Sequence, residues 1–475
     1  MLYRVNNESE RLYVDKSYPP LGLGYIAATL EEAGYQVKAI DLIDAKWEEV
    51  ESILKRESPD IVGLSCNLTD FRWGAFKLAI LAKRLDPNVK VVMGGSHATH
   101  MYEQIMENFP VDVIVRFEGE MTFLDLVNHI DKASDLVDVK GIVYRCKNGV
   151  FKNADRPPIE DLDSLPFPAL RFFDFERYVH YSSPVRVKGK NVAKFKSRNI
   201  MASRGCPYRC QYCSIAAFWR SCKFRSVTNV VDELEYLHKN EGVVHFNFFD
   251  DAFTLNEARV IEICKEIIRR QLEIFWECVT RVDFVSTQML MWMKKAGCVS
   301  ISFGVESGSP AVLKAVNKRQ TVTQIISAFR MTHEAGIRAY VLLMVGNPGE
   351  SEKSINETID LIRLVKPDKI RTTLTRVYPA TELYEGCKMK GLIRDSYWLS
   401  DKAAPIYTAE SNVKQLKRWE DRIIFSYLIQ RRQLSRVFLT ILYRGLFTPT
   451  RHAMERLTPR MNAYMERIDN ILHTS

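Results

Sequence analysis

The chain has 475 residues, and 46% of them are apolar. This length exceeds what one ordinary hydrophobic core accommodates, so we expect two or three domains. No run of 18 apolar residues occurs, and Met1 to Glu10 lack the basic and then apolar order of a secretory signal. We therefore expect a cytoplasmic protein. The formal net charge of +9 is concentrated near the C-terminus, where Lys414 to Arg467 hold 12 basic and 4 acidic residues.

The first 160 residues alternate short apolar runs with helical patterns, which is typical of a doubly wound, Rossmann-like parallel sheet. The helices predicted most clearly are Gly22 to Gly34 and Trp73 to Leu85. The predicted strands are Leu2 to Val5, Gln36 to Asp41, Asp60 to Ser65, Lys90 to Met93 and Asp112 to Val115. These elements predict an N-terminal domain over residues 1–160.

A polar stretch rich in proline follows and predicts a linker over residues 161–195, because proline neither donates to a strand ladder nor continues a helix. Six strands then alternate with helices, which favours an open, partial (β/α)6 barrel of the TIM type over residues 196–390. These strands are predicted near Ile200 and at Val244 to Phe249, Ile274 to Thr280, Val299 to Val305, Arg338 to Val345 and Ile370 to Val377.

Residues 391–475 predict a basic helical region, with a long helix from Val413 to Gly445 and another after Pro449. Two interpretations of the first helix remain open. It packs on the barrel with a solvated basic face, or it makes peripheral contact with anionic lipid and receives a hydrophobic substrate. The tail shows no aromatic and basic alternation of the kind that tracks a nucleic acid strand, which argues against a nucleic acid partner.

The most informative motif is Arg204-Gly205-Cys206-Pro207-Tyr208-Arg209-Cys210-Gln211-Tyr212-Cys213, just after a predicted strand. Spacings of three and then two residues allow one loop to place three thiolates around one iron–sulfur cube and leave the fourth iron open. An open iron can chelate the amino and carboxylate groups of an amino acid such as S-adenosylmethionine (SAM). The alternative is a zinc site with Cys222 as fourth ligand.

With Tyr212 before the third cysteine, the motif resembles the signature of the radical SAM superfamily. The resemblance implies that Cys206, Cys210 and Cys213 bind a 4Fe-4S cluster. It also implies one-electron cleavage of SAM to methionine and a 5′-deoxyadenosyl radical, under anaerobic conditions. An electron donor such as flavodoxin or ferredoxin would then be a partner.

Later segments resemble the motifs with which this family binds SAM. Asp250 or Asp251 is expected at the methionine ammonium, although either aspartate would also serve as a helix N-cap. Arg281 would neutralise the SAM carboxylate or pair with Asp283. The SAM residues implied by the resemblance are Tyr212, Asp250, Asp251, Arg281, Glu306, Ser307, Arg338 and Tyr378.

The N-terminal domain resembles the cobalamin-binding domain fused to one large branch of this family. The resemblance rests on Pro19 to Ala28, Asp60 to Ser65, Gly94 to Thr99 and Glu118 to Glu120. The implied cobalamin residues are Leu21, Gly22, Ser65, Leu68, Thr69, Gly94, Gly95, His97, Glu118, Gly119 and Glu120. The Asp-x-His-x-x-Gly element is absent, so Leu68 is expected under the corrin and no histidine is assigned to cobalt.

Three functional hypotheses remain. The first is a cobalamin-dependent enzyme that methylates an unactivated carbon of a hydrophobic, lipid-like or tetrapyrrole-like metabolite, or closes a ring on it as the family's anaerobic magnesium-protoporphyrin ester cyclases do. The second is a radical enzyme with a vestigial cobalamin domain that rearranges a ring or inserts sulfur. The third is a non-catalytic iron–sulfur or zinc scaffold.

Overall fold

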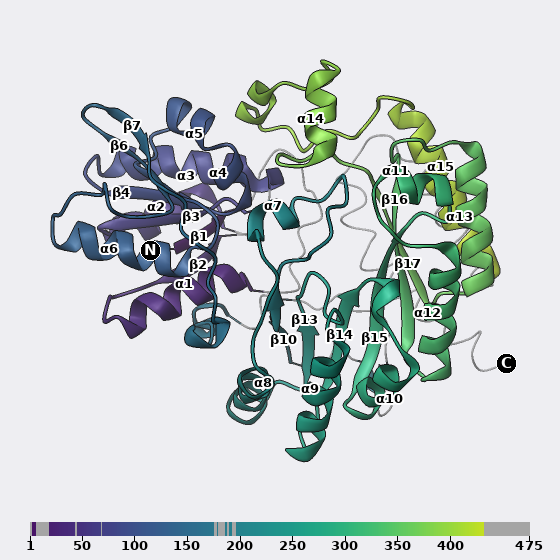
Figure 1. The fold of residues 1–475 in the computed structure, drawn as a ribbon. Helices are drawn as coiled ribbons and strands as arrows, with labels where there is room; N and C mark the ends of the chain where they lie inside the picture. The colour runs from purple at the N-terminus through teal and green to yellow at the C-terminus, as the bar shows by residue number, and fades with distance from the viewer. Residues whose placement is uncertain are drawn as a thin grey trace. The chain divides into compact units, whose positions relative to one another are not determined.

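The structure is a computed structural model that describes residues 2–5, 19–42, 45–67, 69–174, 178, 186–187, 190–191 and 196–431. Residues 1–420 form one compact unit, and residues 421–475 are counted as a second. The described helices are all too short or too polar to cross a membrane. The first unit holds both sheets on which the functional argument depends (Figure 1).

The N-terminal domain is built on a seven-stranded sheet of order β2-β1-β3-β4-β5-β6-β7. Its strands are β1 (Leu2–Val5), β2 (Ala39–Leu42), β3 (Ile61–Ser65), β4 (Lys90–Gly94), β5 (Val113–Val115), β6 (Ile142–Cys146) and β7 (Gly149–Lys152). Its helices are α1 (Leu21–Glu32), α2 (Trp47–Glu57), α3 (Arg72–Leu85), α4 (Ser96–His100), α5 (Tyr102–Asn108) and α6 (Glu120–Asp131). The first five strands in chain order are parallel, so the doubly wound sheet is confirmed.

The antiparallel hairpin of β6 and β7 was not among the predicted elements. Its signal is present, because Asn148-Gly149 lies between two short strand-forming runs and that dipeptide favours a tight hairpin turn. The five parallel strands take the order 2-1-3-4-5, which reverses direction between β1 and β3. In such sheets ligands bind beyond the carboxyl ends of the strands at this reversal.

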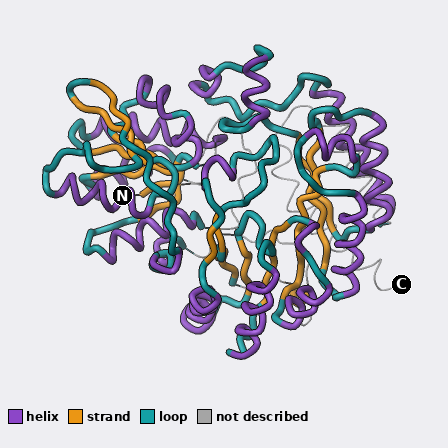
Figure 2. Tube along the Cα trace, viewed as in Figure 1, coloured by secondary structure: helices purple, strands orange, loops and turns teal. Residues whose placement is uncertain are grey.

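The barrel is a six-stranded parallel sheet of order β10-β13-β14-β15-β16-β17, and the helices cover its outer face (Figure 2). Its strands are β10 (Ser197–Ile200), β13 (His245–Phe248), β14 (Phe275–Thr280), β15 (Cys298–Glu306), β16 (Arg338–Val345) and β17 (Lys369–Leu374). The main covering helices are α8 (Val227–Glu241), α9 (Glu257–Arg269), α10 (Thr287–Lys295), α12 (Val322–Glu334) and α13 (Glu352–Val365). The open six-unit barrel predicted from the alternation is therefore confirmed.

Polar caps fix where the covering helices begin. The side chain of a Ser, Asn or Thr accepts a backbone N–H in the first turn of each of them, which satisfies a donor that the helix cannot pair itself. These caps are Ser226, Asn256, Ser286, Thr321 and Ser351. Because α9, α10 and α13 each begin within ten residues of the end of a barrel strand, their caps also position loops at the carboxyl end of the barrel.

The chain after the barrel returns to the N-terminal domain. Residues between Val377 and Tyr407, including α14 (Glu382–Met389), share a buried apolar core with β3, β4 and α3. Trp398 is fully buried in this core. The helix predicted from Val413 to Gly445 is seen as α15 (Val413–Gln430), and its remainder and the helix after Pro449 lie outside the described residues.

Candidate functional site

The cysteine motif forms a loop between the short strand β11 (Ser203–Arg204) and helix α7 (Ile215–Trp219). Gly205 opens the loop with φ of +84°, and a Cβ atom there would lie 2.0 Å from the carbonyl oxygen of Ser221. Only glycine fits this turn without moving the backbone. The loop is also held by its own hydrogen bond from Cys213 N–H to the Cys210 carbonyl, at 3.0 Å.

Two aspartates after β13 hold the start of this loop. Asp250 accepts hydrogen bonds from the Ala202 N–H at 3.1 Å and from the Ser203 hydroxyl. Asp251 accepts the Gly205 N–H at 3.0 Å. Burial raises the pKa of Asp251 to about 6, opposed by that backbone hydrogen bond. The aspartates expected at the SAM ammonium are thus close to the cysteines, and their carboxylates are bonded to the loop.

The three thiols of the motif belong to this one loop, and all three cysteines are partly buried. They influence one another electrostatically, and burial raises the pKa of Cys206 and that of Cys213, the latter to about 12. Among the described residues no three His, Cys, Asp or Glu side chains converge on a single metal ion, which would hold its sulfurs roughly 3.8 Å apart. Cysteine thiolates are the ligands that hold an iron–sulfur cube, so three of them on one loop fit this cluster by residue type.

Arg281, at the end of β14, lies against the same loop. Its guanidinium stacks on the ring of Tyr208, with Cζ 3.7 Å from the ring centroid. It also forms two hydrogen bonds of 2.9 Å with Asp283 and one of 2.8 Å with the Lys318 carbonyl. Of the two roles predicted for Arg281, the pairing with Asp283 is the one the structure shows.

A buried polar cluster lies next to the third cysteine. Lys318 donates to Glu306 at 2.8 Å and to the Tyr212 hydroxyl at 3.3 Å. Glu306 has φ of +65°, a left-handed conformation that costs energy for a residue with a side chain. Burial and then Glu306 raise the pKa of Tyr212 well above its usual value. The cluster offers donors and acceptors for hydroxyl, carboxylate or ammonium groups, as binding of SAM requires. Lys318 was not predicted.

Three other residues predicted to bind SAM are not part of this polar cluster. Ser307 is fully buried, and its hydroxyl lies 3.3 Å from that of Thr358 on α13. Tyr378 donates to Asp70 of the N-terminal domain at 3.0 Å. Arg338 is the first residue of β16. Glu306 pairs with Leu343 of the same strand, which is five residues farther on, or roughly 16 Å. Arg338 is therefore at the amino end of its strand, as the predicted bounds of the strand already implied, and it is not part of the candidate site.

Eight of the predicted cobalamin residues follow the carboxyl ends of β3, β4 and β5 or end these strands, namely Ser65, Thr69, Gly94, Gly95, His97, Glu118, Gly119 and Glu120. Gly95 has φ of +104°, and a Cβ there would lie 2.7 Å from the Asn67 nitrogen. His97 is 1% exposed, and its Nδ1 lies 3.2 Å from the Thr69 hydroxyl. The Nε2 of His97 has no hydrogen-bond partner in the described part of the chain. Ser65 and Gly94 end β3 and β4.

This edge includes the sheet reversal where doubly wound domains bind ligands, and the unpaired imidazole nitrogen leaves hydrogen-bonding capacity there, so the residues fit cobalamin. Leu21 and Gly22 begin α1, and a Cβ on Gly22 would meet nothing within 4 Å. The predicted contact of Leu68 lies outside the described residues.

The acidic pair after β5 is engaged by the cysteine loop. Arg204, two residues before Cys206, donates to Glu118 at 2.8 Å and to Glu120 at 2.6 Å. Gly119 lies between them, and a Cβ there would lie 2.9 Å from the side chain of Ile26. Arg204 was not predicted as a site residue, because its partners are more than 80 positions away in the sequence.

Comparisons with known proteins identify the family. Residues 200–362 match the model of the radical SAM superfamily, and residues 12–127 match the model of the B12 binding domain. An uncharacterised methyltransferase of Pyrococcus horikoshii is 32% identical over 414 residues, covering 86% of each chain. The chain belongs to the radical SAM superfamily. It is an enzyme whose cofactors are a 4Fe-4S cluster, SAM and cobalamin.

Other relatives cover less of their own length. The anaerobic magnesium-protoporphyrin IX monomethyl ester cyclase of Rubrivivax gelatinosus is 32% identical over 78% of this chain, which spans 66% of that protein. Among solved structures, the cobalamin-dependent SAM radical enzyme OxsB matches with a TM-score of 0.72 at 19% identity, over 96% of this chain and 76% of that one. The methyltransferase TsrM from Kitasatospora setae matches with a TM-score of 0.68 at 20% identity, over 82% and 76%. At these identities, the similarity to the two solved structures shows a shared fold.

Proposed function

We propose that this radical SAM enzyme methylates an unactivated carbon of a hydrophobic metabolite. The observation that carries the proposal is the direct contact between the cysteine loop and the domain that binds cobalamin, through Arg204, Glu118 and Glu120. A methyl transfer that uses both cofactors requires them in one site, and this contact joins the segments that would hold them. The relationship to the Pyrococcus methyltransferase over 86% of both chains supports the same reaction.

When bound, the cluster supplies the electron that cleaves SAM to generate a hydrogen-abstracting species, and cobalamin supplies a methyl group for transfer to carbon. Cys206, Cys210 and Cys213 would hold three irons. Their thiols must lose protons to do so, and the raised pKa of Cys213 makes iron binding pH-dependent. Asp251 fixes the entry of the loop through the Gly205 N–H.

The Lys318, Glu306 and Tyr212 cluster would orient SAM. Glu306 is held against Lys318 inside the barrel, where hydrogen bonds are stronger than in water because few water molecules compete for them. The same cluster would hold the ribose hydroxyls or the methionine charges in one orientation. The N-terminal domain and the segment from 377 to 407 would limit the access of water to this end of the barrel.

Oxidative cyclisation is a second candidate, favoured by the 32% identity to the Rubrivivax cyclase over 78% of this chain. A hydrophobic substrate is proposed for both reactions from the basic amphipathic pattern that begins in α15. Small-molecule binding and an external reductant such as flavodoxin or ferredoxin belong to either reaction.

The deciding experiment uses anaerobically reconstituted protein with hydroxocobalamin, a reductant, SAM deuterated in its methyl group, and a metabolite extract of the source organism. Methylation predicts a product that carries the deuterated methyl group, with 5′-deoxyadenosine and S-adenosylhomocysteine formed in equal amounts. Cyclisation predicts a product with two hydrogens fewer and no deuterated methyl. A protein that forms no 5′-deoxyadenosine under these conditions contradicts both reactions.

A matched pair of cysteine variants tests the cluster itself. Cys206→Ala removes one of the three motif thiols, whereas Cys222→Ala removes a neighbouring thiol that contacts the Gly205 carbonyl at 3.6 Å. We expect Cys206→Ala to lose the bound iron and SAM cleavage, and Cys222→Ala to keep both. The zinc alternative predicts instead that Cys222→Ala also loses its metal, since that site needs Cys222 as the fourth ligand.

A further inference from the structure

Arg204 is a buried cation between two domains. Its side chain is 4% exposed, and those of its partners Glu118 and Glu120 are 9% and 6% exposed. The guanidinium also lies 5.2 Å from the ring centroids of Tyr25 on α1 and Trp219 on α7. One side chain thus contacts two segments of the N-terminal domain and the helix that follows the cysteine loop.

The pairing of one side chain with both Glu118 and Glu120 requires an arginine. Two carboxylates one residue apart in a buried segment repel each other and lose hydration unless a cation lies between them. Arginine satisfies both because its planar group offers several N–H donors in a fixed fork, whereas lysine is a point charge. The second oxygen of Glu118 accepts the Ile159 N–H at 2.8 Å, so the end of the N-terminal domain also depends on this arrangement.

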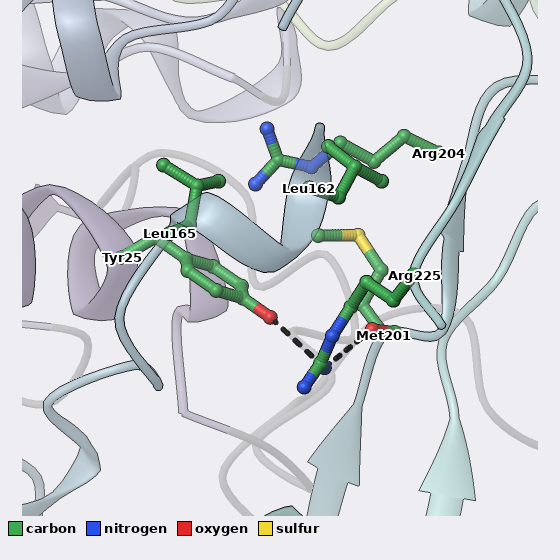
Figure 3. Close-up of a pocket in the computed structure, with 6 residues that line it drawn as sticks. All are labelled: Tyr25, Leu162, Leu165, Met201, Arg204 and Arg225. Atoms are coloured by element: carbon green, nitrogen blue, oxygen red, sulfur yellow. Dashed lines mark hydrogen bonds between the residues drawn. The ribbon is translucent and has the colours of Figure 1, made fainter. Parts of the chain in front are cut away.

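Hydrophobic packing surrounds the contact. Arg204 borders a gap too narrow for water, together with Tyr25, Leu162, Leu165, Met201 and Arg225 (Figure 3). Arg225 donates to the Tyr25 hydroxyl at 3.4 Å and to the Met201 carbonyl at 2.9 Å. Because the side chains of Arg204, Glu118 and Glu120 are nearly fully buried, solvent screens their ion pairs only weakly, and the loss of one partner leaves the other in a low dielectric.

We propose that Arg204 is a positioning residue that sets the distance between the iron–sulfur cluster and cobalamin. The side chain is two residues from the first cluster cysteine, and it fixes the Glu118-Gly119-Glu120 segment at the cobalamin edge of the N-terminal sheet. Movement of either cofactor segment would break a buried ion pair. Arg204 contacts neither cofactor in this role and acts through the two segments that it joins.

The test compares wild-type protein with Arg204→Met and with the triple variant Arg204→Met, Glu118→Gln, Glu120→Gln, in which neutral amides remove the repulsion. Arg198→Met is the matched control, because Arg198 is a buried arginine of the barrel that pairs with Glu241 in the same domain, at 3.3 Å. The first readout is the hydroxocobalamin dissociation constant by absorbance. The second is the faster electron spin relaxation that a reduced cluster causes in nearby cobalt(II).

We expect Arg204→Met to keep its iron content, to weaken hydroxocobalamin binding on the order of tenfold or more, and to reduce the relaxation effect. The triple variant should keep the relaxation effect altered, because the repulsion is gone but the tie is not restored. Arg198→Met should match wild type in both measurements. Arg204→Lys keeps one of the two ion pairs, so both of its readouts should fall between those of wild type and Arg204→Met. It replaces Arg204→Met in the test if that variant does not fold.

Wild-type affinity and relaxation in both Arg204 variants would overturn the proposal. So would a wild-type relaxation effect in the triple variant. The inference rests on the proposed function in that both cofactors must bind one chain. Wild-type protein that binds no hydroxocobalamin would instead contradict the proposed function, so the two failures are distinguishable.

Discussion

Arg72 is the side chain whose removal should most affect the N-terminal domain. It begins α3, it is fully buried, and it donates to the carbonyls of Thr69, Trp398, Ser400 and Lys402 at 2.6 to 2.9 Å. Arg72→Met would leave these four carbonyls unpaired. At about 1 to 3 kcal/mol for each group left unpaired, the gross cost is about 4 to 12 kcal/mol, and we expect the lower part of this range because the bonds to Ser400 and Lys402 are only partly buried.

Part of that cost is recovered, because burial lowers the pKa of Arg72 and removal of a buried charge returns several kcal/mol. We expect a net loss of about 3 to 5 kcal/mol in the free energy of unfolding. Urea unfolding followed by tryptophan fluorescence measures it, and hydrogen exchange should show the segment 398–404 opening. Arg84→Met is the control, because Arg84 is on the same helix and 66% exposed, and it should change stability by less than about 0.5 kcal/mol. Equal stabilities and equal protection of 398–404 in the two variants would refute this reasoning.

Two further substitutions test the barrel. Burial raises the pKa of Glu350 to about 7, although the backbone N–H groups of residues 346–347 oppose this. The stability that protonated Glu350 contributes is therefore fully present below pH 4.5 and is lost as the pH rises through 7. In urea unfolding, the free energy of unfolding of Glu350→Gln relative to wild type should therefore increase by up to about 3 kcal/mol from pH 5 to pH 8. A constant difference across that range would contradict the assignment. Gly205→Ala would push a methyl group into the carbonyl of Ser221 and should lower the bound iron after reconstitution, whereas Gly386→Ala, with open space around it, should load iron as wild type does.

The sequence predicted those features that depend on local pattern. Strand alternation located all six barrel strands, and the spacing of Cys206, Cys210 and Cys213 indicated one loop. Residues that were assigned from a motif alone, or whose contacts depend on distant partners, were harder to predict. Arg338 was assigned to the site from a motif, but its strand places it toward the other end of the barrel. Lys318 was missed because its role is visible only once α11 (Pro310–Ala315) brings it beside Glu306.

Arg204 and Arg72 each join the N-terminal domain to another part of the chain, but only the contact of Arg204 can be recognised in the sequence. Arg204 needs carboxylates, so it imposes acidic side chains at positions 118 and 120, and those residues form a recognisable motif. Arg72 bonds to main-chain carbonyls, which every residue supplies, so positions 398 to 402 carry no signature of the contact. Sequence patterns therefore indicated the acidic segment but assigned it to the cofactor alone, whereas the structure shows that its side chains also bind the barrel.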